Sequence, residues 1–301
     1  MCKLILKLLC KNIFSKLEKF CVIFVYVLII GFAISSYILM FPEMWKRFTL
    51  SSFAINFVFS HILWLNTIYN YTMATFLNPG HPKLKTFAIN KCEKCQRPKP
   101  YRTHHCSICN KCISRMDHHC PWINNCIGKR NHLFFILFVF YAFIGSIYAN
   151  YVITKLRLQS IINVELSFRV YPFNALELIK KYMGLIFFKF NYSVAVSYTQ
   201  RLTRMYFMIS FTLSIVLGIL FVFNVYLISL NITTVEFFIQ KKYFPKKKAS
   251  ILNDKRSNFL KIKGNWLQFA NAKSFSQFLL HIFFTRPNVL LNNNKKYNIP
   301  R

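Results

Sequence analysis

The central segment of the chain reads CEKCQRPKPYRTHHCSICNKCISRMDHHCPWINNC over residues 92–126, and it contains seven of the ten cysteines. A disulfide framework favours even numbers of cysteines and an oxidising compartment, whereas short Cys-x2-Cys pairs interspersed with histidines are typical of zinc sites in reducing surroundings. We therefore predict a metal-binding domain that faces the cytosol.

Counting ligands in this segment singles out three residues. Tetrahedral zinc takes four ligands, so eight ligands would close two sites. Six cysteines and two histidines supply those eight, which leaves Asp117, His118 and Cys120 without a structural role. Thiolate is the reactive form of cysteine, a neighbouring base raises its fraction at neutral pH, and a carboxylate can fix the tautomer of that base. The pattern predicts nucleophilic catalysis by Cys120; the alternative is that Cys120 is a spare or substituted zinc ligand.

Long runs without Asp, Glu, Lys or Arg lie on both sides of this segment. They are Phe20 to Phe41, Phe48 to Leu77, Leu133 to Thr154 and Met205 to Thr234. Each holds the roughly 20 residues that a helix needs to cross a hydrocarbon layer about 30 Å thick. The alternative, buried helices of a large soluble protein, is poor for four such runs, so we predict an α-helical membrane protein with four transmembrane helices. The first run is too long for a signal-peptide core, so we expect it to be retained.

The second run is interrupted by polar residues, namely Asn56, His61, Asn66 and Asn70. Because polar groups in lipid usually turn toward protein or a cavity, we expect most of them to form hydrogen bonds between helices. The alternative for His61 is that it lines a ligand cavity.

The basic residues are distributed unevenly between the two sides of such a four-helix chain. The side that holds both termini and the central segment carries 30 of the 40 Lys and Arg residues. The positive-inside tendency places that side in the cytosol. The net charge of +32 suggests nucleic acid at first sight, but the apolar runs argue against it, and cytosolic basic tails match anionic lipid head groups better. Apolar residues at helical spacing among the lysines of residues 1–19 predict an amphipathic segment at the membrane surface, and Phe275 to Phe283 repeat that pattern.

The cysteine-rich domain of the DHHC protein acyltransferases resembles this chain closely over residues 99–135, KPYRTHHCSICNKCISRMDHHCPWINNCIGKRNHLFF. The chain also has the family's Thr-Thr-x-Glu motif within Asn231–Glu236, and Gly264–Phe269 resembles the family's carboxy-terminal element. One departure is Asn78-Pro79-Gly80 where the family usually has Asp-Pro-Gly. Asparagine keeps a turn-forming side chain but drops a charge, which leaves one expected ionic contact unmade.

The resemblance implies roles for individual residues. One zinc ion is expected on Cys92, Cys95, His105 and Cys112, and a second on Cys106, Cys109, His119 and Cys126. Both ions would be structural. Cys120 would become acylated, His118 would take its proton, and Asp117 would be the partner of His118. Thr233 or Thr234 would brace the active site, and Asn265 would anchor the tail.

The implied activity is protein S-acyltransferase, or palmitoyltransferase. A fatty acyl group would pass from acyl-CoA, such as palmitoyl-CoA, through Cys120 to cytosolic cysteines of membrane-associated proteins. We expect Lys129 and Arg130 near the phosphates of CoA, and Gly145 near the floor of an acyl cavity. A multi-pass protein of the endomembrane system, in the Golgi, endoplasmic reticulum or plasma membrane, is implied. The alternative is a catalytically silent membrane zinc scaffold.

The predicted organisation follows the runs along the chain. It comprises a cytosolic amphipathic segment (1–19), transmembrane helices 1 and 2 (20–77), the cytosolic zinc-binding domain (78–131), transmembrane helix 3 (132–154), a lumenal loop (155–204), transmembrane helix 4 (205–234) and a cytosolic tail (235–301).

Overall fold

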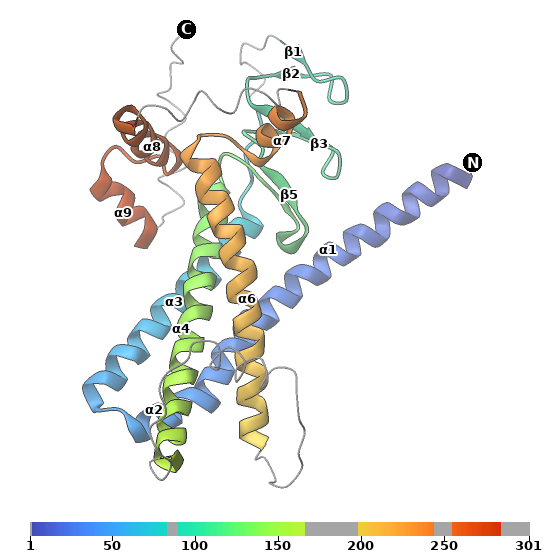
Figure 1. Cartoon of the computed structure of the whole chain (residues 1–301). Coiled ribbons are helices and arrows are strands. Elements are labelled where there is room, and N and C mark those ends of the chain that lie inside the picture. The colour runs from blue at the N-terminus through green and yellow to red at the C-terminus, as the bar shows by residue number, and fades with distance from the viewer. Residues whose placement is uncertain (1, 83–89, 166–197, 244–254, 284–301) are drawn as a thin grey trace.

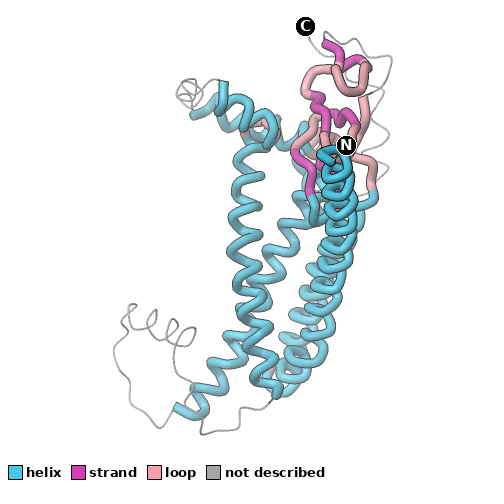
Figure 2. The backbone as a smooth tube through the Cα atoms, turned by 90° about the vertical axis from the view of Figure 1, so that its right-hand side faces the viewer, coloured by secondary structure: helices cyan, strands magenta, loops and turns pink. Residues whose placement is uncertain are grey.

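The computed structural model describes the chain except residues 1, 83–89, 166–197, 244–254 and 284–301. Long helices form a bundle, and the short strands lie together at one end of it (Figures 1 and 2). Most of the predicted loop 155–204 and the end of the predicted tail lie outside the described residues.

The first helical stretch is almost continuous from the amino terminus. Helix α1 (Cys2–Ser35) passes through one wide π turn (Ser36–Met40) into α2 (Phe41–Arg47). Pro42 sits in the first turn of α2 and has no backbone N–H to donate, so the helical hydrogen bonds are interrupted next to the π turn. Residues 2–19 of the predicted amino-terminal segment form the first part of α1, which continues directly into the first apolar run.

In the part of the chain that the structure describes, three further long helices complete the bundle: α3 (Leu50–Phe76), α4 (His132–Glu165) and α6 (Tyr198–Ser229). Within the described residues, three helical stretches are long and apolar enough to cross a membrane: Ile13–Arg47, His132–Leu156 and Leu202–Ser229. They correspond to the first, third and fourth predicted runs. The second run does form a helix, α3, but that helix is not among the three, since polar side chains recur along it.

The four polar residues of α3 that the sequence analysis singled out divide into two pairs. Tyr148 of α4 donates to the Asn56 side chain at 2.6 Å, and His61 bonds the Tyr37 hydroxyl from the π turn, so these two form the expected contacts between helices. Asn66 and Asn70 instead donate to backbone carbonyls of α3 itself, at 2.8 Å each. The prediction of interhelical bonds was wrong for this second pair because a side-chain amide reaches the carbonyl one turn back in its own helix.

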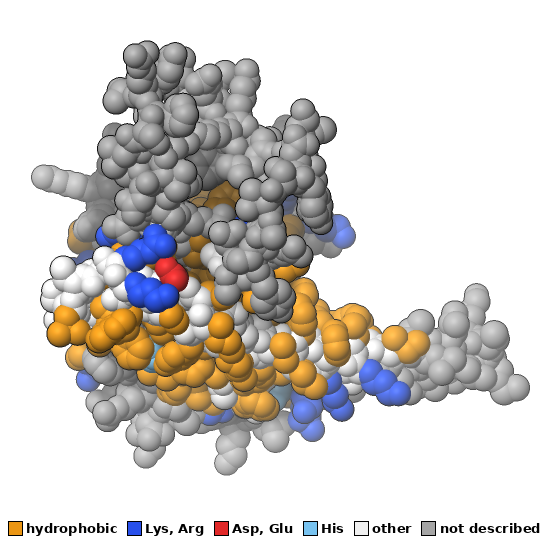
Figure 3. All heavy atoms as spheres, turned by 90° about the horizontal axis from the view of Figure 1, so that it is seen from below, with side chains coloured by type: hydrophobic (Ala, Val, Ile, Leu, Met, Phe, Trp, Pro, Cys, Tyr) orange, Lys and Arg blue, Asp and Glu red, His pale blue; other side chains and the backbone are white. Residues whose placement is uncertain are grey.

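The outer faces of the bundle are apolar. Ile23 of α1, Ile55 of α3 and Val222 of α6 are 62%, 69% and 66% exposed. Seen from the end opposite the strands, hydrophobic side chains cover much of the described surface (Figure 3). Contiguous apolar surface on this scale is unusual for a protein surrounded by water.

The strands form three two-stranded antiparallel sheets in a cysteine-rich head, residues 90–131. The pairs are β1 (Asn90–Lys91) with β2 (Pro98–Lys99), β3 (Thr103–Cys106) with β4 (Lys111–Ser114), and β5 (His118–Cys120) with β6 (Asn125–Ile127). The head is joined to the bundle by polar bonds. Asn125 donates to the carbonyls of Ala74, Thr75 and Leu77 at the end of α3, and Tyr71 of α3 donates to the Trp122 carbonyl at 2.8 Å.

Among the described residues after α6 there are three shorter helices: α7 (Thr234–Tyr243), α8 (Lys255–Phe269) and α9 (Phe275–Phe283). The Asn265 amide of α8 donates to the Ser229 carbonyl at 2.8 Å, which satisfies a carbonyl at the end of α6. The apolar pattern predicted for Phe275 to Phe283 does form a helix, α9, and its Phe278 and Ile282 pack against the start of α4. The carboxy-terminal helices thus cover the junction between α4, α6 and the head.

Candidate active site and metal centres

Two clusters of Cys and His residues occupy the head. The distal cluster is Cys92, Cys95, His105 and Cys112, and the proximal cluster is Cys106, Cys109, His119 and Cys126. In each, the candidate ligand atoms lie within 4.8 Å of one another. These are the same two groups of four that the family resemblance implies, and Cys120 belongs to neither.

The donor atoms of both clusters fit a zinc ion. In the distal cluster the three sulfur atoms lie 3.2–4.0 Å from His105 Nδ1, and in the proximal cluster they lie 3.3–3.8 Å from His119 Nδ1. Zinc bonds of about 2.3 Å to sulfur and 2.0–2.1 Å to nitrogen give a tetrahedron with edges of about 3.5–3.8 Å. Each cluster is therefore a set of three sulfurs and one imidazole that could hold a metal ion.

The strand pairing explains why the ligands meet. Direct cross-strand partners include His105 with Cys112 in the β3–β4 pair and His119 with Cys126 in the β5–β6 pair. Opposite residues of an antiparallel pair have neighbouring side chains. Each hairpin therefore supplies one histidine and one cysteine, and a Cys-x2-Cys turn supplies the other two sulfurs.

The backbone repeats the same turn three times. Gln96, Asn110 and Asn124 have φ angles of 53°, 53° and 47°, a left-handed conformation that non-glycine residues adopt rarely. Each lies four residues after a cysteine, namely Cys92, Cys106 and Cys120. The first two turns carry metal-cluster cysteines, whereas the third carries Cys120 without a cluster.

Cys120 lies at the end of β5 beside a histidine–aspartate pair. His118 Nδ1 donates to Asp117 Oδ2 at 2.7 Å, and His118 and Cys120 line the same end of one cavity. Cys120 is 6% exposed and Asp117 is 1% exposed. The three residues that ligand counting left over are thus brought together, with Asp117 and Cys120 buried and His118 half-buried.

The electrostatics of this group favour a charged pair. Burial lowers the pKa of His118, but the hydrogen bonds and charges of Asp117 and Cys120 outweigh that effect and raise the pKa to about 9. Burial raises the pKa of Asp117, but His132, His118 and the Thr234 backbone N–H hold it well below its usual range. A protonated imidazole next to a cysteine stabilises the thiolate, which is the nucleophilic form.

Helix α7 braces the aspartate. The Thr234 backbone N–H donates to Asp117 Oδ1 at 2.7 Å, and the Thr234 hydroxyl donates to Asp117 Oδ2 at 2.9 Å. Thr233 instead caps the helix, because its backbone N–H donates to Glu236 and its hydroxyl accepts from the Glu236 backbone N–H. Of the two threonines singled out from the sequence, Thr234 is the one that contacts the site.

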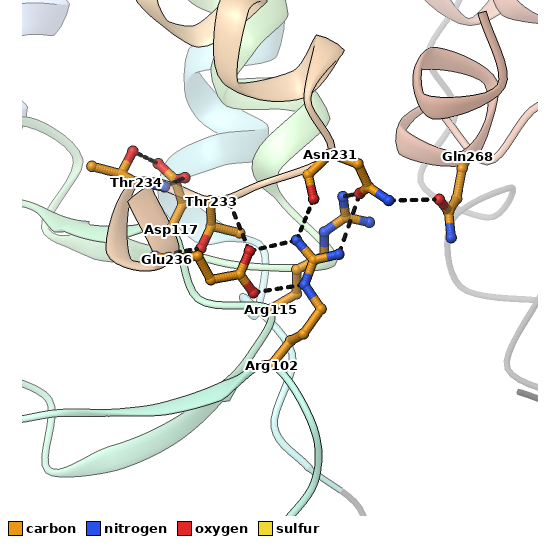
Figure 4. Close-up of polar contacts among 8 residues, drawn as sticks. All are labelled: Arg102, Arg115, Asp117, Asn231, Thr233, Thr234, Glu236 and Gln268. Carbon is orange, nitrogen blue, oxygen red and sulfur yellow. Dashed lines mark hydrogen bonds and ion pairs between the residues drawn. The ribbon is translucent and has the colours of Figure 1, made fainter. Parts of the chain in front are cut away.

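The same turn of α7 also holds the distal part of the head (Figure 4). Both oxygens of Glu236 accept from the Arg102 guanidinium, at 2.6 Å each. Arg102 donates to the Asn231 carbonyl at 2.7 Å, and Arg115 bonds the Asn231 side chain. Asn231 in turn donates to Gln268 of α8 at 3.2 Å. This network ties the head, the end of α6 and α8 together.

The segment Asn78-Pro79-Gly80 forms a tight turn against the head. Asn78 Oδ1 accepts from the Gly80 N–H at 2.9 Å, so the asparagine keeps the turn-forming bond that an aspartate would make. Gly80 has a φ of 104°, and a Cβ atom there would lie 3.3 Å from the Arg130 side chain. Lys129 is exposed and Arg130 is half-buried, next to this turn.

An apolar cavity of about 650 Å³ opens beside Cys120 and runs between the helices. His118, Cys120 and Phe135 line its head end. Its lining includes both Tyr141 and Gly145, and it continues along α4 to Ala149, so Gly145 lies on the wall and the cavity extends beyond it. The far end is more polar: it includes Ser36, Tyr37, His61 and Tyr206. His61 therefore lines the cavity, which was the alternative prediction for this residue.

Sequence reasoning missed several residues that hold the site. Glu18 of α1 accepts from His119 Nε2 at 2.6 Å, and Tyr71 links α3 to the turn after Cys120. Arg102 and Glu236 form the ion pair described above. One signal was available: the chain has only eight acidic residues against 40 basic ones, and Glu18 is the only one among the first 42 residues.

Comparison with known families and proteins agrees with this geometry. A model of the DHHC palmitoyltransferase family matches residues 85–241, slightly more than half of the chain. Palmitoyltransferase ZDHHC16 from Bos taurus is 32% identical over 133 residues, which are 43% of this chain and 35% of that protein. Palmitoyltransferase ZDHHC16 from Homo sapiens is 32% identical over 119 residues, which are 38% of this chain and 32% of that protein. The chain matches only about a third of the length of these relatives.

Proposed function

The chain belongs to the DHHC palmitoyltransferase family, and from that premise we propose that it is a protein S-acyltransferase that carries a fatty acyl group on Cys120. The observation that supports this most directly is the place of Cys120. It lies outside both metal clusters, against the His118–Asp117 pair, and at the mouth of an apolar cavity.

The first half of the reaction would load the enzyme. The Cys120 thiolate attacks the thioester carbon of acyl-CoA, a new thioester bond forms at Cys120, and the bond to CoA breaks. Protonated His118 gives its proton to the leaving CoA thiolate. Asp117 accepts from Nδ1 throughout, which keeps the other ring nitrogen, Nε2, toward the reacting sulfur atoms.

The second half would pass the chain on. The thiol of a substrate cysteine gives its proton to the now neutral His118 and attacks the acyl group on Cys120. Cys120 leaves as a thiolate beside the reprotonated ring, so the starting state is restored. Membrane-associated proteins with cytosolic cysteines are the proposed substrates, because the acyl group would sit where the head meets the bilayer.

We propose two structural zinc ions, one held by each cluster. Zinc bound by three thiolates and one imidazole has a closed coordination shell, so its contribution is to fold stability. The proximal ion would hold the β5–β6 hairpin that carries Cys120. No step of acyl transfer needs either ion as a reactant.

A bilayer would surround four helices in this proposal, with α3 as the span that the apolar pattern marks least clearly. At 27 residues, α3 is long enough, and bonds to α1 and α4 shield part of its polar surface. The head and both termini would lie on the cytosolic side of an endomembrane, as the positive-inside tendency suggests. Lys129 and Arg130 would meet the phosphates of CoA at that boundary.

The cavity is the proposed acyl site. From Phe135 to Ala149 it follows about 21 Å of α4, more than the roughly 15 Å of one leaflet. A Cβ atom on Gly145 would meet nothing within 4 Å, so a larger side chain there would fill the cavity. We expect Gly145→Leu to shift the preference toward shorter acyl chains in autoacylation assays with acyl-CoA of increasing length.

The matched control for that experiment is Gly31→Leu. Gly31 also has open space around it but does not line the cavity. An unchanged chain-length profile in the Gly145 variant would remove Gly145 from the acyl site.

The proposed activity is tested by intact mass spectrometry of the detergent-purified protein incubated with palmitoyl-CoA. We expect a mass gain of one acyl group that hydroxylamine removes, and no such gain in Cys120→Ser. An equal gain in the Cys120→Ser protein, or none in either protein, would favour a silent zinc scaffold.

A further inference from the structure

A single buried acid lies on the exposed amino-terminal part of α1. Among residues 13–28, Glu18 is the only buried residue, and it is 4% exposed. A buried carboxylate is costly unless it is paired and hydrogen-bonded. Over these residues α1 therefore buries one side chain, and that side chain carries a carboxylate.

The partner of Glu18 is a ligand of the proximal cluster. His119 directs Nδ1 toward the sulfur atoms of Cys106, Cys109 and Cys126 and donates from Nε2 to Glu18 Oε1 at 2.6 Å. Both side chains are only 5% exposed. An imidazole that binds a metal through Nδ1 carries its proton on Nε2, so a carboxylate at Nε2 fixes the tautomer and the ring orientation.

The distal cluster has no such carboxylate in the described part of the chain. His105 also directs Nδ1 toward its three sulfur atoms. Its Nε2 is buried and, among the described residues, has no hydrogen-bond partner. The two clusters have identical ligand types but differ in the hydrogen-bond partner of the histidine Nε2 atom.

Glu18 also connects the proximal cluster to the cavity. The part of α1 that lines one wall of the cavity begins six residues after Glu18 and runs from Phe24 through Ile29 to Ala33. Ile29 packs in the same core as Cys120. A fixed Glu18–His119 bond therefore holds α1 against the turn that carries Cys120.

We infer that Glu18 is a positioning residue: it orients His119 on the proximal metal ion and thereby fastens α1, one wall of the cavity, to the active-site turn. The metal part of this inference is independent of the proposed acyl transfer, and only its consequence for the cavity rests on that proposed function.

The test uses the full-length, zinc-loaded protein in detergent. A chelator is added together with N-ethylmaleimide, and peptide mass spectrometry follows the alkylation of each cysteine with time. In Glu18→Ala we expect Cys106, Cys109 and Cys126 to become alkylated about 10- to 100-fold faster, because loss of a hydrogen-bond partner of a metal-bound histidine lowers the metal affinity by about that factor. We expect the three distal cysteines to keep their wild-type rates.

Two further variants keep the test decisive. Glu18→Gln retains an oxygen that can accept from Nε2, so its proximal rates are expected between those of the wild type and Glu18→Ala; this variant carries the test if Glu18→Ala does not fold. Glu93→Gln removes an exposed carboxylate beside Cys92 and is expected to change nothing.

The inference is overturned if the proximal cysteines of Glu18→Ala are alkylated at wild-type rates. If Glu18→Ala does not fold, the same result in Glu18→Gln overturns it. Equal acceleration of both clusters overturns it as well, since that indicates general loosening. Autoacylation measured on the same samples separates the two proposals: a wild type that loads no acyl group refutes the proposed function while the alkylation pattern still decides the role of Glu18.

Discussion

The proximal and distal clusters have the same ligand types, three cysteines and one histidine, in two different surroundings. A shift of 14 residues carries Cys92, Cys95, His105 and Cys112 onto Cys106, Cys109, His119 and Cys126. The distal cluster lies in the outer part of the head and is held through Arg102 to α7. The proximal cluster shares a hairpin with Cys120 and is joined to α1 through Glu18. The two clusters therefore differ in their positions and contacts and not in their ligand types.

The same shift, applied once more, explains why Cys120 belongs to neither cluster. It carries Cys106 onto Cys120 and Cys109 onto Ile123. Ile123 is 1% exposed and packs in the core with Cys120, so a buried isoleucine stands where a second sulfur would complete a Cys-x2-Cys pair. The third turn keeps the backbone of the metal turns but cannot hold a metal through that pair.

The largest effect is expected from removing one ligand of each cluster in turn. Cys126→Ala should lose the proximal ion and abolish autoacylation, because the β5–β6 hairpin depends on that ion. Cys95→Ala should lose one ion but keep measurable autoacylation, since Arg102 still ties the outer part of the head to α7. Zinc content and intact mass after incubation with palmitoyl-CoA measure both. An equal loss of activity in the two variants would contradict the distinction.

The next effect concerns Asp117 and its counterpart 14 residues earlier, Thr103. Asp117→Asn should slow autoacylation by about 10²- to 10⁴-fold, because an amide favours the wrong tautomer of the adjacent histidine. Thr103→Val is the control and should act like wild type, because the Thr103 hydroxyl is buried without a partner among the described residues. Single-turnover rates decide the matter, and a loss of less than tenfold in Asp117→Asn would argue against its role.

A third prediction tests how the distal part of the head is held. Glu236→Gln should lower the unfolding free energy by about 1.5–3 kcal/mol, because it removes a charged partner of Arg102 that is largely shielded from water. The control is Glu43→Gln, whose ion pairs with Lys46 and Arg47 are more exposed and should contribute about 0–1 kcal/mol. Thermal unfolding in detergent reports both.

The Glu236 effect should depend on pH in a defined direction. Burial raises the pKa of Glu236, but Arg102 and the Thr233 N–H outweigh it and lower the pKa below its ordinary value of 4.5. The contribution to stability is therefore complete above about pH 4.5 and is lost as the pH falls through the lower folded-state pKa. A difference between wild type and Glu236→Gln that persists undiminished well below pH 4 would contradict the pairing.

The smallest effect is expected at Thr234. Thr234→Val removes the hydroxyl that donates to Asp117 but keeps the backbone N–H bond, so autoacylation should slow by about tenfold, near 1.4 kcal/mol. Thr212→Val removes an exposed hydroxyl that bonds only its own helix in the described structure and should leave the rate unchanged. Matching rates in the two variants would show that the backbone bond suffices.

Much of the head could be predicted because its information is local. The ligands of a structural zinc site are usually Cys and His residues at short spacings, so the sequence limits the candidate ligands to a few residues. Asp117, His118 and Cys120 remain once eight ligands are counted. The apolar runs likewise predict the long helices, since helix length and hydrophobicity are properties of a segment. Local patterns were less informative for α3, where side-chain amides can bond either their own helix or a neighbouring one.

The sequence by itself determined the candidate ligands, the cysteine that belongs to neither cluster and the apolar helices, because each depends on residue types at fixed separations along the chain. Only the tertiary structure decided which side chains form hydrogen bonds that hold these residues in place. Glu18 lies 101 positions before His119, and Glu236 lies 134 positions after Arg102. Such contacts depend on how helices pack rather than on spacing, so a lone acid in a basic chain becomes informative only when its partner is seen.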